Sequence, residues 1–362
     1  MTPGSRYPFV TVIMPVRNEA AYIARSLGAV LAQDYPPDRM EVLVVDGMSE
    51  DGTREIVRSI IDHGRRGTDR NPPSVVHGRP SVFLLDNLAL IVPTALNLGL
   101  RHARGEVIVR VDGHCEIASN YVRRCVEVLQ ETGADNVGGI WVTVGETLIA
   151  RAIALAQSSR FGVGGAAFRV GCSRPGFVDT VPFGAYRREV FQRIGGFDEE
   201  LVRNQDDEFN FRLTQAGGKI WLDPSIRSVY YSRASLRGLW RQYFQYGLYK
   251  VRVMQKRRGI PSWRHLVPGA FVAGLLGSGL LALVTRQPLW ALSVAGPYVV
   301  ANGVASLWAA RRDPRALAFL PLAFATLHLA YGLGFLWGLW RWRAHHKELI
   351  AGRSSAQEAP HA

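Results

Sequence analysis

The sequence predicts an α/β fold built on an open parallel sheet, followed by C-terminal transmembrane helices. Short apolar runs bounded by turn residues alternate with helical segments near the start of the chain, which is typical of parallel α/β sheets. Three long stretches without a charged residue follow in the last third. The chain has 362 residues, 48% of them hydrophobic, so we expect more than one structural unit and a sizeable core.

Four apolar runs rich in Val, Ile and Leu are predicted to be buried strands. They are Phe9–Pro15, Glu41–Val45, Ser81–Leu85 and Val107–Val111. Helices are expected over residues 21–33 and 54–62, directly after the first two strands. No G-x-G-x-x-G motif follows the first strand, which disfavours a dehydrogenase of the usual dinucleotide-binding kind.

The three uncharged stretches are long enough to cross a membrane. They are Leu266–Thr285, Gln287–Ala310 and Ala316–Trp340, and a transmembrane helix needs about 20 apolar residues. The part from Arg233 onward holds 17 Lys and Arg residues but 3 Asp and Glu residues, whereas the preceding part holds 26 and 27. Because the positive charge adjoins the apolar stretches, we expect contact with membrane lipids and no binding of nucleic acid.

Lys and Arg residues beside the apolar stretches predict their orientation. Eight basic and no acidic residues between Arg233 and Arg258 indicate a cytoplasmic segment, so the Arg286 loop is expected outside and loop 311–315 inside. A third crossing would then place Arg341, Arg343 and Lys347 outside, against the rule.

The sequence leaves two explanations for this conflict. Either the last stretch is re-entrant near Gly332 and Gly334, or the positive-inside rule is broken there.

These observations predict a multi-pass protein of the cell membrane with four segments. We expect a cytoplasmic α/β domain over residues 1–232, a basic amphipathic interfacial segment over 233–262, a transmembrane region of about three helices over 263–343, and a polar tail over 344–362. The start of the chain lacks the pattern of a secretory signal, and the three cysteines lack the spacing of metal ligands. Both features fit a domain in a reducing compartment.

Two aspartates follow predicted strands at the edge where ligands of such sheets bind. Asp46 ends the second strand and Asp112 follows the fourth, and ligands sit at the carboxyl ends of parallel strands. Asp46 could instead form an Asx-turn or a helix cap. Spacing alone leaves both interpretations open.

Three segments in fixed order resemble the inverting family 2 glycosyltransferases of GT-A fold. Val12–Glu19 (VIMPVRNE) is similar to their P-x-x-N-E turn, and Val44–Thr53 (VVDGMSEDGT) to V-D-D-G-S-x-D-G-T. Asn97–His114 (NLGLRHARGEVIVRVDGH) is similar to N-x-G…A-x-G-E…D-x-D. Within the family, exopolysaccharide glucosyltransferases of the succinoglycan type are similar to the chain in R-V-D-G-H, Phe161–Gly164 (FGVG) and Val178–Gly184 (VDTVPFG). The likeness spans about residues 8–255.

The resemblance implies a GT-A fold, a Rossmann-like open sheet that binds a nucleotide sugar. The implied nucleotide-sugar site comprises Pro15, Arg17, Glu19, Asp46, Asn97 and Asp112. In this site Asp46 would accept a hydrogen bond from N3–H of uracil. Glu19 is a weaker candidate, because it could instead cap the following helix.

Asp112-Gly113-His114 departs from the D-x-D of the family at its last position. That position carries a carboxylate that helps to bind a divalent cation on the donor phosphates. An imidazole nitrogen suits Mn²⁺ better than Mg²⁺, which prefers oxygen ligands. We therefore expect a metal site with His114 and Asp112, with Asp112 contacting ribose or metal-bound water, and a preference for Mn²⁺.

Asn204-Gln205-Asp206-Asp207-Glu208 precedes a predicted helix and resembles the family motif E-D-x-D-x-x-x-R. Alignment on Arg212 gives Asp206 the role of catalytic base and Glu208 that of the second acid, with Asp207 as the rival base. A structural explanation is also available, because acidic residues in the first turn of a helix interact favourably with its dipole.

The segment Ser232–Arg258 is basic and aromatic, which is typical of a helix lying on an anionic membrane surface. Within it, Gln242–Tyr246 (QYFQY) faintly resembles the Q-x-x-R-W motif of processive synthases, so Gln242 and Tyr246 are candidates for sugar or pyrophosphate contact.

The resemblance implies a membrane-anchored hexosyltransferase of surface-polysaccharide synthesis. It would move a hexose, most simply glucose, from a UDP-sugar to a lipid-linked saccharide or growing polysaccharide, in company with polysaccharide assembly proteins. Transfer to polyprenyl phosphate and processive synthesis are enzymatic alternatives. An inactive glycosyltransferase-like membrane scaffold is the alternative from another class, because His114 and Gln205 depart from the family pattern.

Overall fold

The computed structural model describes residues 7–65, 79–260 and 262–343, which form two compact units. Unit 1 comprises Met1–Val144 and Ala166–Tyr231, and unit 2 comprises Gly145–Gly165 and Ser232–Ala362. The sequence-based division places its first boundary at residue 232, whereas the structure assigns Gly145–Gly165 to the second unit. The predicted polar tail, 344–362, lies outside the described residues.

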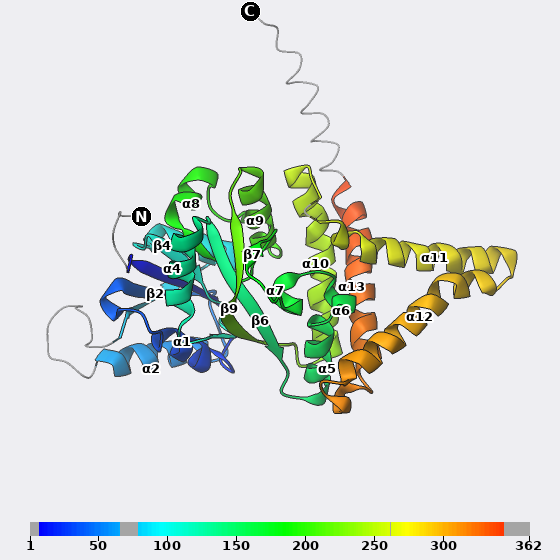
Figure 1. Cartoon of the computed structure of the whole chain (residues 1–362), viewed down its shortest axis with the longest axis horizontal. Helices are drawn as coiled ribbons and strands as arrows, with labels where there is room; N and C mark the ends of the chain where they lie inside the picture. Colours follow the sequence, from blue (N-terminus) through cyan, green and yellow to red (C-terminus); the bar gives the residue numbers. More distant parts are fainter. Residues whose placement is uncertain (1–6, 66–78, 261, 344–362) are drawn as a thin grey trace, which may run out of the picture. The chain divides into compact units, whose positions relative to one another are not determined.

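Unit 1 is built on a mixed sheet with the strand order β3-β2-β1-β4-β8-β6-β9-β5, to which β7 adds by pairing with β9 (Figure 1). Its strands are β1 (Val10–Val16), β2 (Met40–Asp46), β3 (Ser81–Asp86), β4 (Val107–Arg110), β5 (Cys115–Ile117), β6 (Asn136–Val144), β7 (Gly176–Phe177), β8 (Ala185–Arg187) and β9 (Ile220–Tyr231). From β3 to β4 the strands are parallel, and β8 runs antiparallel to β4. The predicted open α/β sheet is confirmed, and the bounds of the four predicted strands agree with the structure to within one residue.

Helices cover both faces of this sheet. One face carries α1 (Ile23–Leu31), α2 (Thr53–Arg65) and α4 (Tyr121–Thr132), and the other carries α3 (Val92–His102), α8 (Arg188–Ile194) and α9 (Gln205–Gln215). Along β1, Val12 and Met14 join the first core whereas Ile13 joins the second. Because successive side chains of a strand point to opposite faces, these strands must be apolar throughout, as their sequences are.

The strand register aligns the carboxyl ends of the parallel strands β1, β2 and β3 with one another. Val16 at the end of β1 is paired with Asp46 at the end of β2, which is paired with Asp86 at the end of β3. The loops after β1, β2 and β4 therefore emerge from one edge of the sheet, where the motif residues lie.

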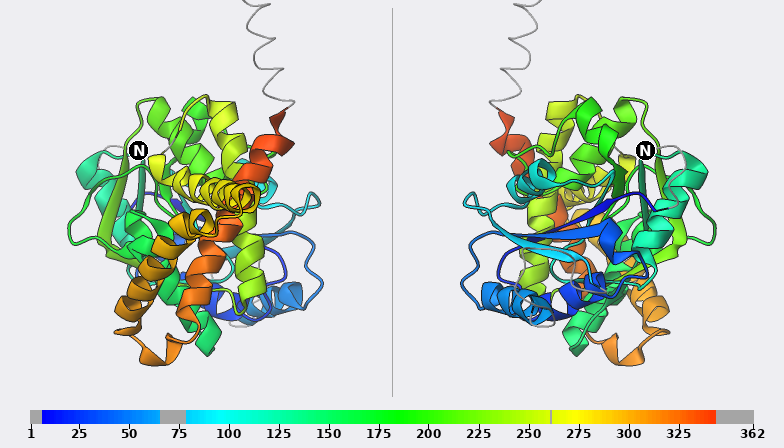
Figure 2. Two further views of the ribbon diagram at one scale, coloured as in Figure 1. Left: turned by 90° about the vertical axis from the view of Figure 1, so that its right-hand side faces the viewer. Right: turned by 90° about the vertical axis from the view of Figure 1, so that its left-hand side faces the viewer.

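Unit 2 is helical. Its helices are α5 (Leu148–Gln157), α6 (Arg160–Val163), α10 (Leu236–Arg257), α11 (Val267–Thr285), α12 (Leu289–Ala310) and α13 (Leu320–Arg341). Three of them, α11 with the turn before it, α12 and α13, are long and apolar enough to cross a membrane. They coincide with the three predicted stretches. In Figure 1, α11 and α12 form a hairpin that points away from α13, and the left view of Figure 2 looks onto the hairpin.

Gly139 lies where the register of β6 shifts against β9, and a Cβ atom at this position would collide with the carbonyl group of Ile226. We expect Gly139→Ala to lower the free energy of unfolding by about 1–3 kcal/mol, because neither backbone can move without distorting the sheet. Gly28 is the control, because it is exposed in α1 with nothing near its missing Cβ. Gly28→Ala should be neutral or stabilising by up to about 1 kcal/mol. Thermal unfolding of both variants measures the difference, and equal stabilities would contradict this packing.

Candidate functional site

Asp46 is fully buried at the end of β2 and holds the turn that follows. Its carboxylate accepts hydrogen bonds from the backbone N–H of Ser49 (3.0 Å), the Ser49 hydroxyl (2.5 Å) and Nη1 of Arg54 (2.6 Å). Arg54 also donates from Nη2 to Asp86 at 2.7 Å, and these bonds to Asp86 and Asp46 raise the pKa of the guanidinium. These bonds agree with the alternative role of Asp46 as the residue that forms an Asx-turn. Its contact with a nucleotide base stays a prediction.

The loops after β1 and β2 are joined by reciprocal hydrogen bonds. Asn18 donates from its backbone N–H to the Ser49 hydroxyl (2.8 Å), and its side-chain oxygen accepts from the backbone N–H of Glu50 (3.0 Å). The backbone N–H of Glu19 donates to the Thr53 hydroxyl (2.8 Å). Asn18 and Met48 have positive φ angles (55° and 53°), so each of the two loops contains one residue with a left-handed backbone conformation.

Pro15 and Arg17 have separate positions in this region. Pro15 lies within β1, paired with Val45, and is buried. Arg17 is exposed after the strand, and its guanidinium reaches the carbonyl group of Leu90 at 3.4 Å. Their predicted part in nucleotide binding is untested by these contacts.

Arg110 at the end of β4 links two of the predicted acids. Its Nε and Nη2 donate to the two carboxylate oxygens of Asp112 (2.8 and 3.1 Å), and its Nη1 lies 3.8 Å from Oδ2 of Asp206. The side chain is 8% exposed. Although burial opposes the charge, Asp112 and Asp206 raise the pKa of Arg110 above its usual range, so it is a fixed cation.

The Nη1 atom of Arg110 is buried and has no hydrogen-bond partner among the described residues. At 3.8 Å its interaction with Asp206 is an ion pair without a hydrogen bond. A donor left unpaired beside a carboxylate is suited to a ligand oxygen or to a water that bridges the two groups. Sequence reasoning missed Arg110, although a charged residue inside an apolar strand is a recognisable signal.

His114 lies against the loop after β1. Its Nδ1 is 2.8 Å from Oε1 of Glu19, and its ring meets the edge of Tyr230 with centroids 5.5 Å apart. Gly113 between Asp112 and His114 is closely packed, since a Cβ atom there would lie 3.0 Å from side-chain atoms of Val16 and Glu19. Glu19 therefore contacts a predicted metal ligand.

No group of three or more His, Cys, Asp or Glu residues suited to a metal ion occurs within the described parts of the chain. A divalent cation held mainly by phosphate oxygens needs only one or two protein ligands. Nε2 of His114 is the candidate protein ligand, because both carboxylate oxygens of Asp112 already accept hydrogen bonds from Arg110. Asp112 is then suited to contact ribose or metal-bound water, and the residues fit a cation that is held mainly by a diphosphate.

Asp206 lies in the first turn of α9 and is partly exposed. Its Oδ1 accepts a hydrogen bond from the backbone N–H of Asp207 at 2.9 Å, while Oδ2 faces Arg110. Of the two rival bases, Asp206 is thus the one that the described ion pairs connect to Asp112 through Arg110.

Glu208 and Arg212 on the same helix fasten a turn. Glu208 is fully buried and pairs with Nε of Arg212 at 3.0 Å. Arg212 also donates to the carbonyl groups of Ile194 and Gly196. The motif around Asp206 predicted both residues as part of the acceptor site. The contacts observed here stabilise the turn, and a contact with the acceptor stays a prediction.

Asn97 on α3 holds the same turn from the other side. Its side chain exchanges hydrogen bonds with the backbone N–H and C=O of Phe197, both at 2.8 Å, and Nδ2 reaches Glu199 at the same distance. Gly196 is needed because a Cβ atom would meet Oδ1 of Asn97. The predicted nucleotide-sugar role of Asn97 stays a prediction beside this observed one.

An aromatic and basic row continues from His114. Tyr230 stacks on Trp141 with centroids 4.4 Å apart, and the guanidinium of Arg169 in α7 (Ala167–Val170) lies 4.6 Å from the Trp141 ring. Nη1 of Arg169, Nε1 of Trp141 and the Thr143 hydroxyl are buried without a hydrogen-bond partner in the described chain. Sequence reasoning missed this row, because its members lie far apart in sequence.

Gln242 and Tyr246 belong to unit 2. They lie one turn apart on α10, where Nε2 of Gln242 donates to the Tyr246 hydroxyl at 3.0 Å. Their predicted contact with sugar or pyrophosphate is untested.

The bidentate contact between Arg110 and Asp112 predicts a selective loss of stability. Arg110→Lys keeps the positive charge but not the fork that matches a carboxylate, so we expect a loss of about 1–3 kcal/mol in the free energy of unfolding. Arg123→Lys is the matched control, because Arg123 pairs with Asp34 and Glu127 at the surface, where such pairs contribute about 0–1 kcal/mol. Denaturant unfolding compares the variants, and a loss as large in Arg123→Lys would show that burial of the pair is unimportant.

Comparison with known proteins adds a family and a fold. The family description "Glycosyl transferase family 2" matches residues 11–195. The succinoglycan biosynthesis protein ExoA of Rhizobium meliloti is 32% identical over 328 residues, which is 90% of this chain and 93% of that protein. A dolichyl N-acetyl-alpha-D-glucosaminyl phosphate 3-beta-D-2,3-diacetamido-2,3-dideoxy-beta-D-glucuronosyltransferase of Methanococcus voltae is 26% identical over 338 residues, covering 91% and 97% of the two chains.

A solved structure shares the fold. The mannosyltransferase PcManGT from Pyrobaculum calidifontis, in complex with GDP-Man and Mn²⁺, superimposes with a TM-score of 0.55 at 21% identity, over 92% of this chain and 88% of that one. Together with the sheet described above, this likeness confirms the GT-A fold that the sequence resemblance implied.

Proposed function

The chain belongs to glycosyl transferase family 2, and on that premise we propose that it moves a hexose from a UDP-sugar to a lipid-linked saccharide acceptor at a membrane. The similarity to ExoA, a succinoglycan biosynthesis protein, over 90% of the chain favours surface-polysaccharide synthesis. Glucose is the donor sugar that the sequence resemblance implies most simply. The similarity to a transferase that acts on a dolichyl phosphate-linked sugar favours a lipid-linked acceptor. The three apolar helices favour multi-pass insertion. The eight basic residues between Arg233 and Arg258 favour the cytoplasmic side for catalysis.

The observation that carries the proposal is the buried Arg110 between Asp112 and Asp206. A transferase must neutralise the donor diphosphate and place a base near the sugar that is transferred. Asp112 follows β4, at the carboxyl end of which the nucleotide would bind, and Asp206 lies in the first turn of α9. Arg110 contacts both carboxylates, and the side chain of Asp206 stays partly exposed, so it can still accept a proton.

In the proposed reaction Asp206 accepts the proton of an acceptor hydroxyl, and that oxygen attacks the anomeric carbon. The bond to the diphosphate breaks in the same displacement, so the configuration inverts and UDP leaves. His114 and Asp112 would hold a divalent cation, which stabilises the negative charge that develops on the leaving diphosphate. Glu19 orients the His114 ring through its bond to Nδ1 and leaves Nε2 for the metal.

Asp206→Asn should abolish transfer while the fold is kept. A positioned general base contributes about 10²–10⁴-fold to a rate, so we expect a loss of that size. The assay measures UDP release from UDP-glucose by membranes that contain the full chain, with and without a polyprenyl-linked saccharide extract.

Asp207→Asn is the control for the neighbouring carboxylate and should retain most activity. The reverse pattern would assign the base to Asp207. No nucleotide release by the folded wild-type protein from UDP-glucose or from any of several other sugar nucleotides, with the acceptor extract present, would contradict the proposed transfer and favour the inactive scaffold.

Removal of divalent cations with EDTA should stop UDP release, and Mn²⁺ should restore it better than Mg²⁺. His114→Asp replaces the imidazole with an oxygen ligand, so the ratio of Mn²⁺-supported to Mg²⁺-supported activity should fall. UDP release is measured while Mn²⁺ or Mg²⁺ is titrated into the EDTA-treated wild type and into His114→Asp. Superior activity with Mg²⁺ in the wild type would contradict the role of His114 as a ligand.

A further inference from the structure

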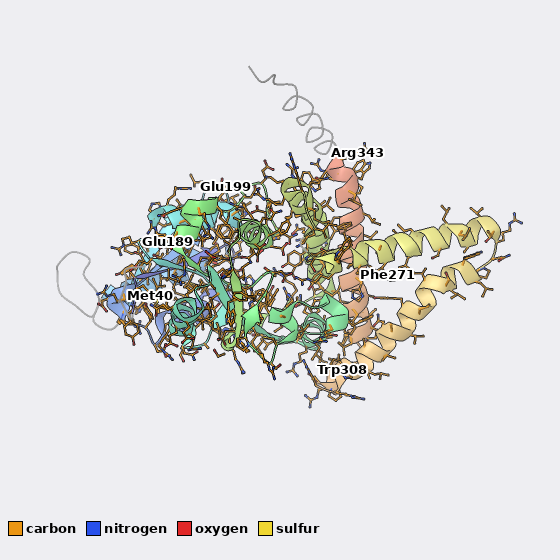
Figure 3. All side chains as sticks on the ribbon, turned by 45° about the horizontal axis from the view of Figure 1, so that its top comes forward. Met40, Glu189, Glu199, Phe271, Trp308 and Arg343 are labelled. Carbon is orange, nitrogen blue, oxygen red and sulfur yellow. The ribbon has the colours of Figure 1, made fainter. Side chains whose placement is uncertain are left out.

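The three helices that are long enough to cross a membrane differ in their surroundings. In the most apolar 18-residue stretch of each span, 11% of the residues are buried in α11 with its preceding turn and in α12, whereas 44% are buried in α13. The hairpin of α11 and α12 exposes large apolar side chains on most sides, such as Leu283 (78%), Val300 (67%) and Trp308 (56%). Figure 3 labels Phe271 on α11 and Trp308 on α12. Such a surface is stable in a lipid environment.

The lengths of α11 and α12 match a bilayer. With 19 and 22 residues they are about 28 and 33 Å long, close to the hydrocarbon thickness of about 30 Å. Phe271 and Tyr298 hold the two helices together, with ring centroids 4.4 Å apart. The hairpin can therefore cross and return.

α13 is instead packed along α10. Glycines bring the two backbones into direct contact, since a Cβ atom on Gly247 would collide with the carbonyl group of Tyr331 and one on Gly334 with that of Phe244. Further along, a Cβ atom on Gly338 would lie 2.8 Å from the carbonyl oxygen of Leu248. The two helices lie side by side in Figures 1 and 2. A crossing of α13 would consequently carry α10 into the bilayer with it.

α10 is unsuited to the interior of a bilayer. Its 22 residues include six basic side chains and no acidic one, namely Arg237, Arg241, Lys250, Arg252, Lys256 and Arg257. Charged side chains at the bilayer centre are strongly unfavourable, and basic helices of this kind bind at the surface.

The other neighbours of α13 are also unsuited to lipid. Its buried residues Phe324 and Leu327 pack in one cluster with Ile153 of α5. Near the middle of α13, Nε2 of His328 is 2.8 Å from the carbonyl oxygen of Phe161, in the short helix and loops around α6. Irregular backbone occurs at membrane depth only where protein or a cavity covers it.

The distribution of charge independently supports the same topology. If α11 and α12 alone cross, Arg264, the loop Arg311–Arg315 and Arg341 share one side with α10, and Arg286 at the tip of the hairpin is on the other. This arrangement removes the conflict with the positive-inside rule that a third crossing creates.

We propose that the α11–α12 hairpin is the only membrane-crossing part of the described chain. α10 and α13 form a basic platform on the surface of the leaflet that faces the catalytic unit. Chain continuity fixes that side, because α10 begins five residues after β9 ends. The partner of the hairpin is the bilayer interior, and the partner of the platform is the anionic headgroup layer.

Single cysteines in the full-length chain test this topology. Cys172→Ser provides the background, because Cys115 and Cys125 are buried and their burial raises the pKa of both thiols well above its usual value, which makes them unreactive. Gln287→Cys, Arg312→Cys and Arg343→Cys then place one exposed thiol at the hairpin tip, in the loop before α13, and after α13. A membrane-impermeant maleimide is applied to spheroplasts of a bacterial host before and after permeabilisation.

We expect the thiol at 287 to be labelled in intact spheroplasts and those at 312 and 343 only after permeabilisation. Labelling at 343 without permeabilisation means a third crossing, and protection at 287 means that the hairpin does not reach the far side. Labelling at 312 in intact spheroplasts means the opposite orientation. Each of these three results overturns the proposal. Variants are compared only when permeabilised samples label fully, and UDP release from the same membranes reports separately on the proposed function.

Discussion

The candidate site depends on the burial of one positive charge at the end of β4. A guanidinium that is 8% exposed is tolerable only when carboxylates compensate it, and Asp112 and Asp206 do so from two different elements. Arg110 thereby links two acids that lie far apart in the sequence. α9 is held on the sheet by its buried residues Phe209 and Leu213, and the charge of Arg110 links its first turn to the end of β4.

Around this centre, motif residues hold loops in shape. Asn97 and Arg212 both fasten the turn that contains Gly196, and Asn18 with Ser49 joins the first two loops. A loop that must present groups to a ligand benefits from such bonds, because the entropy of ordering it is then lost on folding and not on binding. A motif residue can therefore be essential to a site without contacting the ligand.

The second unit follows another rule, because two of its helices have no protein partner over most of their surface. α11 and α12 are apolar on all sides, whereas α13 approaches α10 through glycines as closely as backbones allow. Close backbone contact increases the dispersion attraction between the two helices without large side chains. It also means that α13 must lie in the same environment as the basic helix α10. Hydropathy alone treats the three helices as equal.

The sequence by itself determined the open α/β sheet, the bounds of its first four strands, the family and the three apolar helices, because these depend on local periodicity and on motifs of fixed spacing. It also predicted Asp46, Asp112, His114 and Asp206 as functional residues, but the strand order came from the structure. Only the tertiary structure decided which side chains compensate one another: Arg110 with Asp206, Glu19 with His114, and the row of Tyr230, Trp141 and Arg169. Such pairings, like the burial of α13 against α10, join segments distant in sequence, and no local pattern in a single chain records which of them meet.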